Sequence, residues 1–297
     1  MTTNTPSDVR IPTNGLQLAG HLYLPATTDS PVPAIVVGHP TTGVKEQSPA
    51  LYAERLVAEG FAVLTFDAAY QGESEGLPRG LEDPFQRAED FRAAVSFLST
   101  RAEVDAERVG AMGICGSGAY VTYAAQTDHR MKAVAAVSGT DVPSFFRGGD
   151  AEAWNQMVAA SGALRSAEAA GEPAATFPVL PDAGTPDLPA PVAEFVDYYK
   201  TPRGHHPRAT GEMVTRSADL LDQYDSFADV AKIAPRPLLM IAGTEAATRG
   251  FSEQAVDTSP GNAELHLVEG ATHVDLYDRK VDEAAVKLVA FFRENLG

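Results

Sequence analysis

The residue best suited to covalent chemistry in this chain is its only cysteine, Cys115. It follows the apolar run 109–114 and is flanked by Gly113, Gly116 and Ser117. Small residues at these positions are typical of a tight, strained turn that joins a buried strand to a helix and presents a nucleophile. A thiol on such a turn can attack an acyl carbonyl when a base removes its proton. The alternative is that Cys115 is a small buried hydrophobic residue, the commonest role of a free cysteine.

His273 is the candidate base. It lies in the loop that follows the last apolar run, residues 264–268, where a base can be delivered to the same edge of a sheet. A protonated imidazole at this place, together with the start of a helix at Gly116, should lower the pKa of Cys115 below its ordinary value of about 8.5. The expected reactive group is therefore a thiolate paired with His273.

The acidic residue that orients the base has two candidates. Glu245 is the only carboxylate in the loop after the apolar run 237–242. Asp141 lies two residues beyond Gly139, close to the end of another predicted strand. A third interpretation is a Cys–His dyad without an essential acid, because a thiol ionises more readily than a hydroxyl.

An oxyanion hole requires two backbone N–H groups that point at the developing negative charge. One is expected from Gly116, directly after the nucleophile. The other is expected from Thr41 or Thr42, in the loop 38–43 that follows an apolar run. Pro40 has no N–H to donate. We interpret His39 as a residue that shapes this loop.

The candidate site residues must be positioned by regular secondary structure. Along the chain, sequence patterns typical of strands alternate with patterns typical of helices. Short apolar runs are typical of parallel strands that are covered on both faces. Strands are predicted at 16–24, 34–38, 61–66, 109–114, 133–137, 237–242 and 264–268, and helices at 50–59, 84–100, after Cys115 and at 281–295. Alternation through helical crossovers predicts an α/β protein with a doubly wound, mostly parallel sheet.

Residues 142–229 interrupt this alternation with an Ala-rich stretch and a Pro-rich passage. We interpret them as a cap inserted before the last two strands, with residues 1–141 and 230–297 forming the core. The alternative is a peripheral decoration. Candidate substrate contacts are aromatic: Tyr70 in the core, and Phe145, Trp154, Tyr198 and Tyr199 in the cap. The cap aromatics could equally form the cap's own core.

Composition excludes several classes of function. The 297 residues carry a formal net charge of −17, which argues against binding to nucleic acid or to anionic lipid. The sequence has neither a membrane-spanning apolar run nor a signal-peptide core, so we expect a cytoplasmic protein. One cysteine permits no intrachain disulfide, and the spacing of Cys and His predicts no metal site and no cofactor. Self-association into a homo-oligomer is compatible with these features.

The chain resembles the α/β-hydrolases, and more narrowly their dienelactone-hydrolase-like branch. The residues that carry the resemblance are Gly113-Ile-Cys-Gly-Ser117, His39-Pro-Thr-Thr-Gly43, Phe66-Asp67 and Gly270-Ala-Thr-His273. Dienelactone hydrolases carry a Glu where this chain has Pro40, and they lack the cap. The resemblance therefore implies cysteine-dependent acyl chemistry without specifying the substrate.

The function expected from the sequence is hydrolysis of a small-molecule carboxylic ester, lactone or thioester through an acyl-thioenzyme. An acyltransferase or cyclase would use the same residues, with an alcohol, amine or thiol in place of water. A third class is a binding protein that has a hydrolase fold but no turnover.

Overall fold

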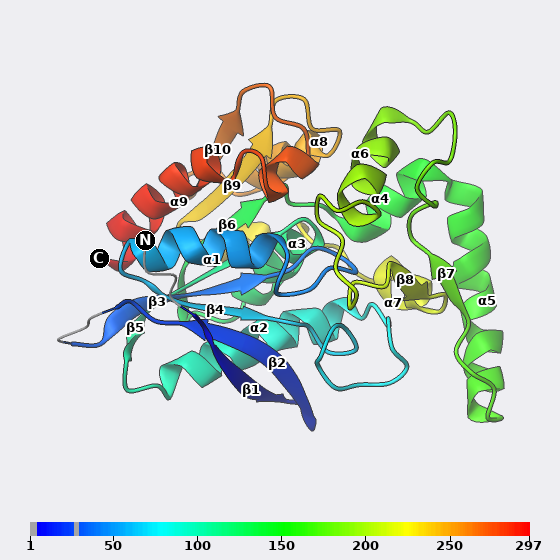
Figure 1. Ribbon diagram of the computed structural model, residues 1–297, viewed down its shortest axis with the longest axis horizontal. Coiled ribbons are helices and arrows are strands. Elements are labelled where there is room, and N and C mark those ends of the chain that lie inside the picture. Colours follow the sequence, from blue (N-terminus) through cyan, green and yellow to red (C-terminus); the bar gives the residue numbers. More distant parts are fainter. Residues whose placement is uncertain (1–4, 27–29) are drawn as a thin grey trace.

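An eight-stranded sheet forms the centre of the structure, a computed structural model that describes residues 5–26 and 30–297 (Figure 1). Its spatial order is β1-β2-β4-β3-β5-β6-β9-β10. The strands are β1 (Ser7–Thr13), β2 (Leu16–Tyr23), β3 (Val32–Gly38), β4 (Ala62–Phe66), β5 (Val104–Ile114), β6 (Met131–Val137), β9 (Leu238–Gly243) and β10 (Ala263–Val268). Strand β2 is antiparallel to β1 and β4, and the remaining neighbours are parallel. This topology confirms the predicted α/β-hydrolase fold.

Helices cover both faces of the sheet because its central strands are apolar on both faces. Val36 of β3 faces one hydrophobic cluster, whereas its neighbours Ile35 and Val37 face the other. Successive residues of a strand point in opposite directions, so a continuous apolar run needs helices on each side. Helices α2 (Pro84–Ser99), α3 (Gly116–Ala125) and α8 (Arg249–Thr258) contribute to the first cluster, and α1 (Ser48–Ala58) and α9 (Val281–Leu296) to the second.

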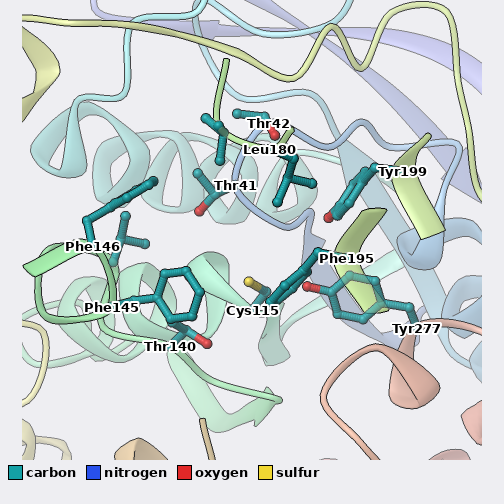
Figure 2. Close-up of a pocket in the computed structure, with 12 residues that line it drawn as sticks. Thr41, Thr42, Cys115, Thr140, Phe145, Phe146, Leu180, Phe195, Tyr199 and Tyr277 are labelled. Carbon is teal, nitrogen blue, oxygen red and sulfur yellow. The ribbon is translucent and has the colours of Figure 1, made fainter. Parts of the chain in front are cut away.

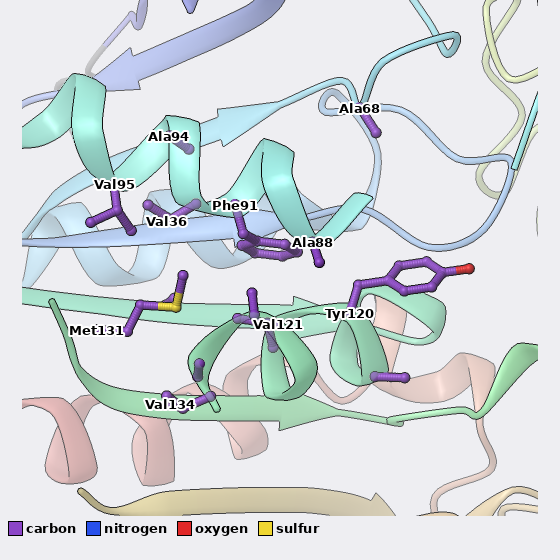
Figure 3. Packing of buried hydrophobic residues seen from close by; sticks show 14 of the residues in the cluster. Val36, Ala68, Ala88, Phe91, Ala94, Val95, Tyr120, Val121, Met131 and Val134 are labelled. Carbon is purple, nitrogen blue, oxygen red and sulfur yellow. The ribbon is translucent and has the colours of Figure 1, made fainter. Parts of the chain in front are cut away.

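The first cluster packs α2 and α3 against the centre of the sheet (Figure 3). Phe91 of α2 lies between Val36 of β3 and the aliphatic side chains of α3. The ring of Phe91 also meets that of Phe66 edge-on, with 5.3 Å between ring centroids. This packing fixes the start of α3, which directly follows Cys115.

Strand β1 and helix α8 were not predicted from the sequence. Strand β1 is an edge strand, and it exposes Asp8 and Arg10 to solvent. Helix α8 buries only Ser252 and Ala255, so its apolar pattern is too weak to predict a helix. Both elements owe their conformation to neighbouring strands rather than to strong local patterns.

Residues 142–229 connect β6 to β9 and lie to one side of the sheet (Figure 1). Their elements are α4 (Val142–Gly149), α5 (Ala151–Ala169), β7 (Thr176–Pro178), α6 (Ala190–Tyr199), β8 (Glu212–Val214) and α7 (Ser217–Asp222). Strands β7 and β8 form a short antiparallel ribbon. The short helix η1 (Val230–Ile233) then leads back to β9, and a second, η2 (Val274–Tyr277), follows β10.

Asp90 of α2 is a fully buried carboxyl group that holds the loop after β4. Its oxygens accept hydrogen bonds from the Ala69 N–H at 2.8 Å and from the Gln86 amide at 2.7 Å. Burial raises the pKa of Asp90 to about 7, because removal from water disfavours the charged form. The folded protein therefore retains a proton that an unfolded chain, with an aspartate pKa near 4, releases.

We expect the free energy of unfolding to fall as pH rises from about 4 to about 7 through this one group. Asp90→Asn is neutral at every pH and removes the effect, which is about 2 to 3 kcal/mol between pH 5 and pH 8. Urea unfolding of both proteins at the two pH values measures it. The free energy of unfolding of the wild type minus that of D90N should be smaller at pH 8 than at pH 5. If this difference is the same at both pH values, folded Asp90 is already ionised at pH 5.

Candidate active site

Cys115 stands on a strained turn between β5 and α3. Its backbone has φ 56° and ψ −123°, a conformation that non-glycine residues rarely adopt. Three backbone hydrogen bonds hold it there: the Cys115 N–H donates to the Val137 carbonyl, and the Cys115 carbonyl accepts from Gly118 and Thr140. Strain that the surroundings maintain in this way is a common property of functional turns.

The glycines around Cys115 allow close backbone approaches. A Cβ atom on Gly113 would lie 2.0 Å from the Ser117 carbonyl oxygen, and one on Gly116 would lie 2.3 Å from Thr41 Oγ1. Ser117 replaces the glycine expected at the end of this motif, and its hydroxyl donates a 2.5 Å hydrogen bond to the His39 carbonyl. The serine thus ties the turn to the loop that carries Thr41.

Two backbone N–H groups point at the Cys115 sulfur, those of Gly116 and Thr41, and both lower its pKa. They are in the positions that an oxyanion hole requires. Of the two predicted threonines, Thr41 is the one whose N–H points at the sulfur, while Thr42 lines the adjoining pocket. Thr41 lines it as well, and its buried hydroxyl oxygen has no hydrogen-bond partner among the residues that the structure describes.

His39 shapes this loop, as predicted from the sequence. Its Nδ1 is 2.7 Å from the Pro40 carbonyl oxygen, and its Nε2 accepts a hydrogen bond from the Ala68 N–H. Burial and the neighbouring Arg87 guanidinium hold the pKa of His39 well below its usual range. A neutral imidazole with both nitrogens engaged has a structural role here.

A largely apolar pocket with an empty volume of about 520 Å³, which includes space open to solvent, adjoins Cys115 (Figure 2). The core and residues 142–229 both line it. The core residues are Thr41, Thr42, Cys115, Thr140 and Tyr277; the others are Val142, Phe145, Phe146, Val179, Leu180, Phe195 and Tyr199.

Two of the five predicted substrate contacts, Phe145 and Tyr199, line this pocket, and three do not. Trp154 is buried inside residues 142–229, where it stacks on Phe146 and donates a hydrogen bond to Asp222. Tyr198 packs edge-on against Tyr277 and lies outside the pocket. Tyr70 packs against the core, and a Cβ on Gly76 would touch its ring. Aromatic character alone does not distinguish residues that line the pocket from residues that pack inside the protein. It also gives no sign of the aliphatic residues Val179 and Leu180, which line the pocket.

His273 is completely buried behind the pocket wall. Its Nδ1 is 2.5 Å from the Thr248 hydroxyl oxygen, and its Nε2 is 2.9 Å from the Tyr277 hydroxyl oxygen. The ring of Phe195 covers it at 5.0 Å between ring centroids, and Ser138 Oγ donates to its carbonyl. Within the described residues no hydrogen bond joins His273 directly to Cys115; Tyr277 contacts both.

The structure brings neither predicted acid to His273. Glu245 is exposed, and its backbone N–H donates to the Ala271 carbonyl while its side chain faces solvent. Asp141 caps α4 through the Ser144 N–H and accepts a hydrogen bond from the Ser226 hydroxyl. The place expected for an acid beside Nδ1 is occupied by Thr248, the residue before α8. Sequence reasoning missed Thr248 because α8 was not predicted.

The protonation states also differ from the expected thiolate–imidazolium pair. Burial raises the pKa of Cys115, although hydrogen bonds from Tyr277 and the Gly116 N–H act in the opposite direction. Burial lowers the pKa of His273 to about 3. In this conformation, at neutral pH, the site holds a neutral thiol and a neutral imidazole.

We expect Thr248→Val to lower kcat/KM for an activated ester at least about tenfold. Valine keeps the shape of the residue but leaves His273 Nδ1 buried without a partner, so the imidazole loses its orientation. Thr248 makes no side-chain hydrogen bond that caps α8, so the helix is unaffected. Glu245→Gln is the matched control and should stay within twofold. A tenfold or larger loss in Glu245→Gln, with Thr248→Val within twofold of wild type, would show that Glu245 reaches His273 during the reaction.

Two other expectations concerned metals and membranes. In the described parts of the chain, no cluster of three or more His, Cys, Asp or Glu side chains is arranged to hold a metal ion. Over the same residues, no helix has the length and hydropathy needed to span a bilayer.

Comparison with known proteins identifies relatives that match along most of the chain. The uncharacterized protein YcjY of Escherichia coli is 38% identical over 296 residues, which span 95% of each chain. The crystal structure of hypothetical protein PA2218 from Pseudomonas aeruginosa superposes with a TM-score of 0.93 at 35% identity, and covers 100% of this chain and 95% of that one.

A third relative, the thiohydrolase aneE of Aspergillus aculeatus, is 35% identical over 159 residues, or 54% of this chain and 49% of its own. The family model described as X-Pro dipeptidyl-peptidase (S15 family) matches residues 14–236. The match supports the superfamily, whereas the narrower dienelactone-hydrolase branch stays a prediction. The chain is therefore an α/β-hydrolase that belongs to the X-Pro dipeptidyl-peptidase (S15) family.

Proposed function

We propose that this protein hydrolyses a carboxylic ester, lactone or thioester of a small molecule with an apolar acyl group, and that Cys115 is its nucleophile. One observation carries the proposal: the sole thiol stands on a strained turn, beside an apolar pocket, where the N–H groups of Gly116 and Thr41 converge. Such convergence serves an oxygen that gains negative charge during acyl transfer.

The chemistry has two stages. The sulfur attacks the carbonyl carbon, the carbonyl oxygen becomes an oxyanion, and the N–H groups of Gly116 and Thr41 stabilise it. The intermediate collapses to an acyl-thioenzyme and releases an alcohol or thiol, and water then attacks the thioester and releases the acid. Because Cys115 and His273 are both neutral before reaction, the thiol proton leaves during the attack rather than before it.

The pocket suggests the substrate class. Phe145, Phe195, Val179 and Leu180 offer apolar contacts to an acyl chain, while polar atoms gather near Cys115. Pockets of this kind bind a ligand through its apolar surface and orient it by a few polar groups. The name of the fungal thiohydrolase relative adds support for a thioester. Residues 142–229 act as a cap in this proposal, because they supply most of these contacts.

Acid-quenched mass spectrometry tests the proposal. The protein is mixed with p-nitrophenyl esters and N-acetylcysteamine thioesters of increasing chain length, quenched within one turnover, digested and mapped. We expect an acyl adduct on the peptide that contains Cys115, and none after alkylation with iodoacetamide, since Cys115 is the only thiol. Turnover that persists after complete alkylation, or an adduct elsewhere, would overturn the proposal.

Product analysis separates hydrolysis from the alternatives. With an alcohol, amine or thiol present in millimolar amounts, a hydrolase still releases mainly free acid, whereas an acyltransferase forms the new ester, amide or thioester. A binding protein would form no adduct and no product, and its affinity for an acyl ligand would not depend on Cys115.

A further inference from the structure

The hydroxyl group of Tyr277 lies between the candidate nucleophile and the candidate base. It is 2.9 Å from His273 Nε2, and by donating a hydrogen bond to the ionised Cys115 sulfur it lowers the pKa of that thiol. Figure 2 shows the hydroxyl pointing towards Cys115 and Phe195. Tyr277 lines the pocket, whereas His273 does not. A proton that moves between sulfur and imidazole in this arrangement meets the tyrosine oxygen first.

We propose that Tyr277 is a catalytic residue that passes the thiol proton of Cys115 to His273. The proposal rests on the proposed function, in which Cys115 attacks an acyl carbonyl. It assigns to Tyr277 the contact with the reacting sulfur that a histidine makes directly in a Cys–His pair.

The hydrogen bonds that Tyr277 and its neighbours can donate and accept are compatible with an arrangement of protons that allows the relay. A tyrosine hydroxyl donates one hydrogen bond and accepts two. Tyr277 has three partners: the Cys115 thiol, the Tyr199 hydroxyl and His273 Nε2. While the thiol is protonated, the Tyr277 hydroxyl can accept from it and from the Tyr199 hydroxyl and donate to His273, whose other nitrogen then donates to Thr248. Once the thiol proton has left, Tyr277 donates to the sulfur, and this is the hydrogen bond that lowers the pKa of Cys115. In the neutral site the protons of Cys115, Tyr277 and His273 thus point along the series from the sulfur towards Thr248.

The transfer balances without a charged tyrosine. As the bond between sulfur and carbonyl carbon forms, the S–H proton moves to the Tyr277 oxygen, and the Tyr277 proton moves to His273 Nε2. The products are a neutral tyrosine, an imidazolium and an oxyanion held by the N–H groups of Gly116 and Thr41. The reverse transfer protonates the leaving alcohol or thiol, and the same route serves the attacking water in the second stage.

Tyr277 is held rigidly enough for this role. It is the last residue of η2, one helical turn after His273, and its side chain is fully buried. The ring of Tyr198 meets its ring edge-on at 5.1 Å between centroids, and that of Tyr199 meets it at 6.3 Å. Burial also raises the pKa of Tyr277 well above its ordinary value, so it remains protonated before the reaction.

The connection between residues 142–229 and η2 further fixes the position. Glu194 of α6 accepts a hydrogen bond from the Val274 N–H, and Arg203 forms an ion pair with Asp278 at 2.7 Å. The first contact lies within the segment that carries His273 and Tyr277, and the second lies directly after it. The sulfur, the hydroxyl and the imidazole are therefore arranged before substrate binds, as acid–base catalysis requires.

Tyr277→Phe tests the relay, with Tyr198→Phe as matched control. Tyr198 also packs against Tyr277, but it does not line the pocket. The rate of acylation is followed as the p-nitrophenol burst in mixtures of light and heavy water. We expect Y277F to slow acylation about 100-fold or more, and Y198F to stay within threefold.

The dependence of the wild-type rate on the deuterium fraction should be curved, since two protons move together, and in Y277F it should become linear. A merely structural role for Tyr277 would lower the rate without changing this dependence. If Y277F does not fold, the wild-type measurement alone decides, and a linear dependence overturns the relay.

The two proposals fail in different ways. An acyl adduct that maps to Cys115, together with Y277F acylation within threefold of wild type, overturns the relay alone. Absence of any adduct on Cys115 in the wild type overturns the proposed function and the relay with it. Slow formation of the adduct on Cys115 in Y277F supports both.

Discussion

Replacing Cys115 with alanine is expected to lower kcat/KM for an acyl substrate by at least about 1,000-fold. Removing a nucleophile eliminates the covalent intermediate, and only binding and the oxyanion hole remain to accelerate attack by water. The N–H groups of Gly116 and Thr41 stay in place in this variant, so a small residual rate is expected. Initial rates with the best p-nitrophenyl ester or thioester measure the loss.

Two comparisons make the result decisive. Cys115→Ser keeps a nucleophilic atom in the same position, and we expect it to retain more activity than Cys115→Ala, although less than wild type. Both variants should bind a non-hydrolysable acyl ligand with wild-type affinity and unfold at a similar temperature. Activity within tenfold of wild type in Cys115→Ala would contradict the assignment of the nucleophile.

Replacing Gly113 with alanine is expected to cost about 3 to 5 kcal/mol of the free energy of unfolding. The new Cβ would lie 2.0 Å from the carbonyl oxygen of Ser117 and 2.5 Å from the backbone nitrogen of Gly118. Both atoms belong to the first turn of α3, so no side-chain rotation relieves the clash, and β5 must separate from the helix. Urea unfolding of the purified variant measures the cost.

Gly162→Ala is the matched control. Gly162 lies within α5, is exposed, and a Cβ there would meet nothing within 4 Å. Alanine favours a helix over glycine by up to about 1 kcal/mol, so this variant should be slightly more stable than wild type. If Gly113→Ala were as stable as wild type, the close approach of β5 and α3 would not be a determinant of the turn.

The scaffold and the position of the thiol could be predicted because each depends on short-range patterns. The continuous apolar runs 34–38 and 133–137 are buried on both faces, as the structure confirms. Small residues around Cys115 predicted a tight turn, and the structure places it in one. Parallel strands direct their carboxyl ends to one edge of the sheet, so the loops of Thr41, Cys115 and His273 were expected together.

Residues 142–229 could be predicted as an insertion because they interrupt the alternation of strands and helices, but the contacts of their side chains were not predictable. Phe145 and Trp154 have similar apolar character, yet one lines the pocket and the other is buried behind Phe146. Which side of a helix faces a cavity depends on how that helix packs against distant segments, and a local pattern contains no such information.

The sequence by itself determined the sheet, the strained turn with its cysteine, and the loops that meet beside it, because these follow from burial, periodicity and small residues close in the chain. Only the tertiary structure decided which side chains lie beside Cys115 and His273. Thr248, rather than Glu245, lies beside His273, and Tyr277 lies between that histidine and Cys115. The tertiary structure also decided the protonation states of Cys115 and His273, because burial raises the pKa of Cys115 and lowers that of His273. Removal from water depends on residues far away in the sequence, among them Phe195, whose ring covers the imidazole.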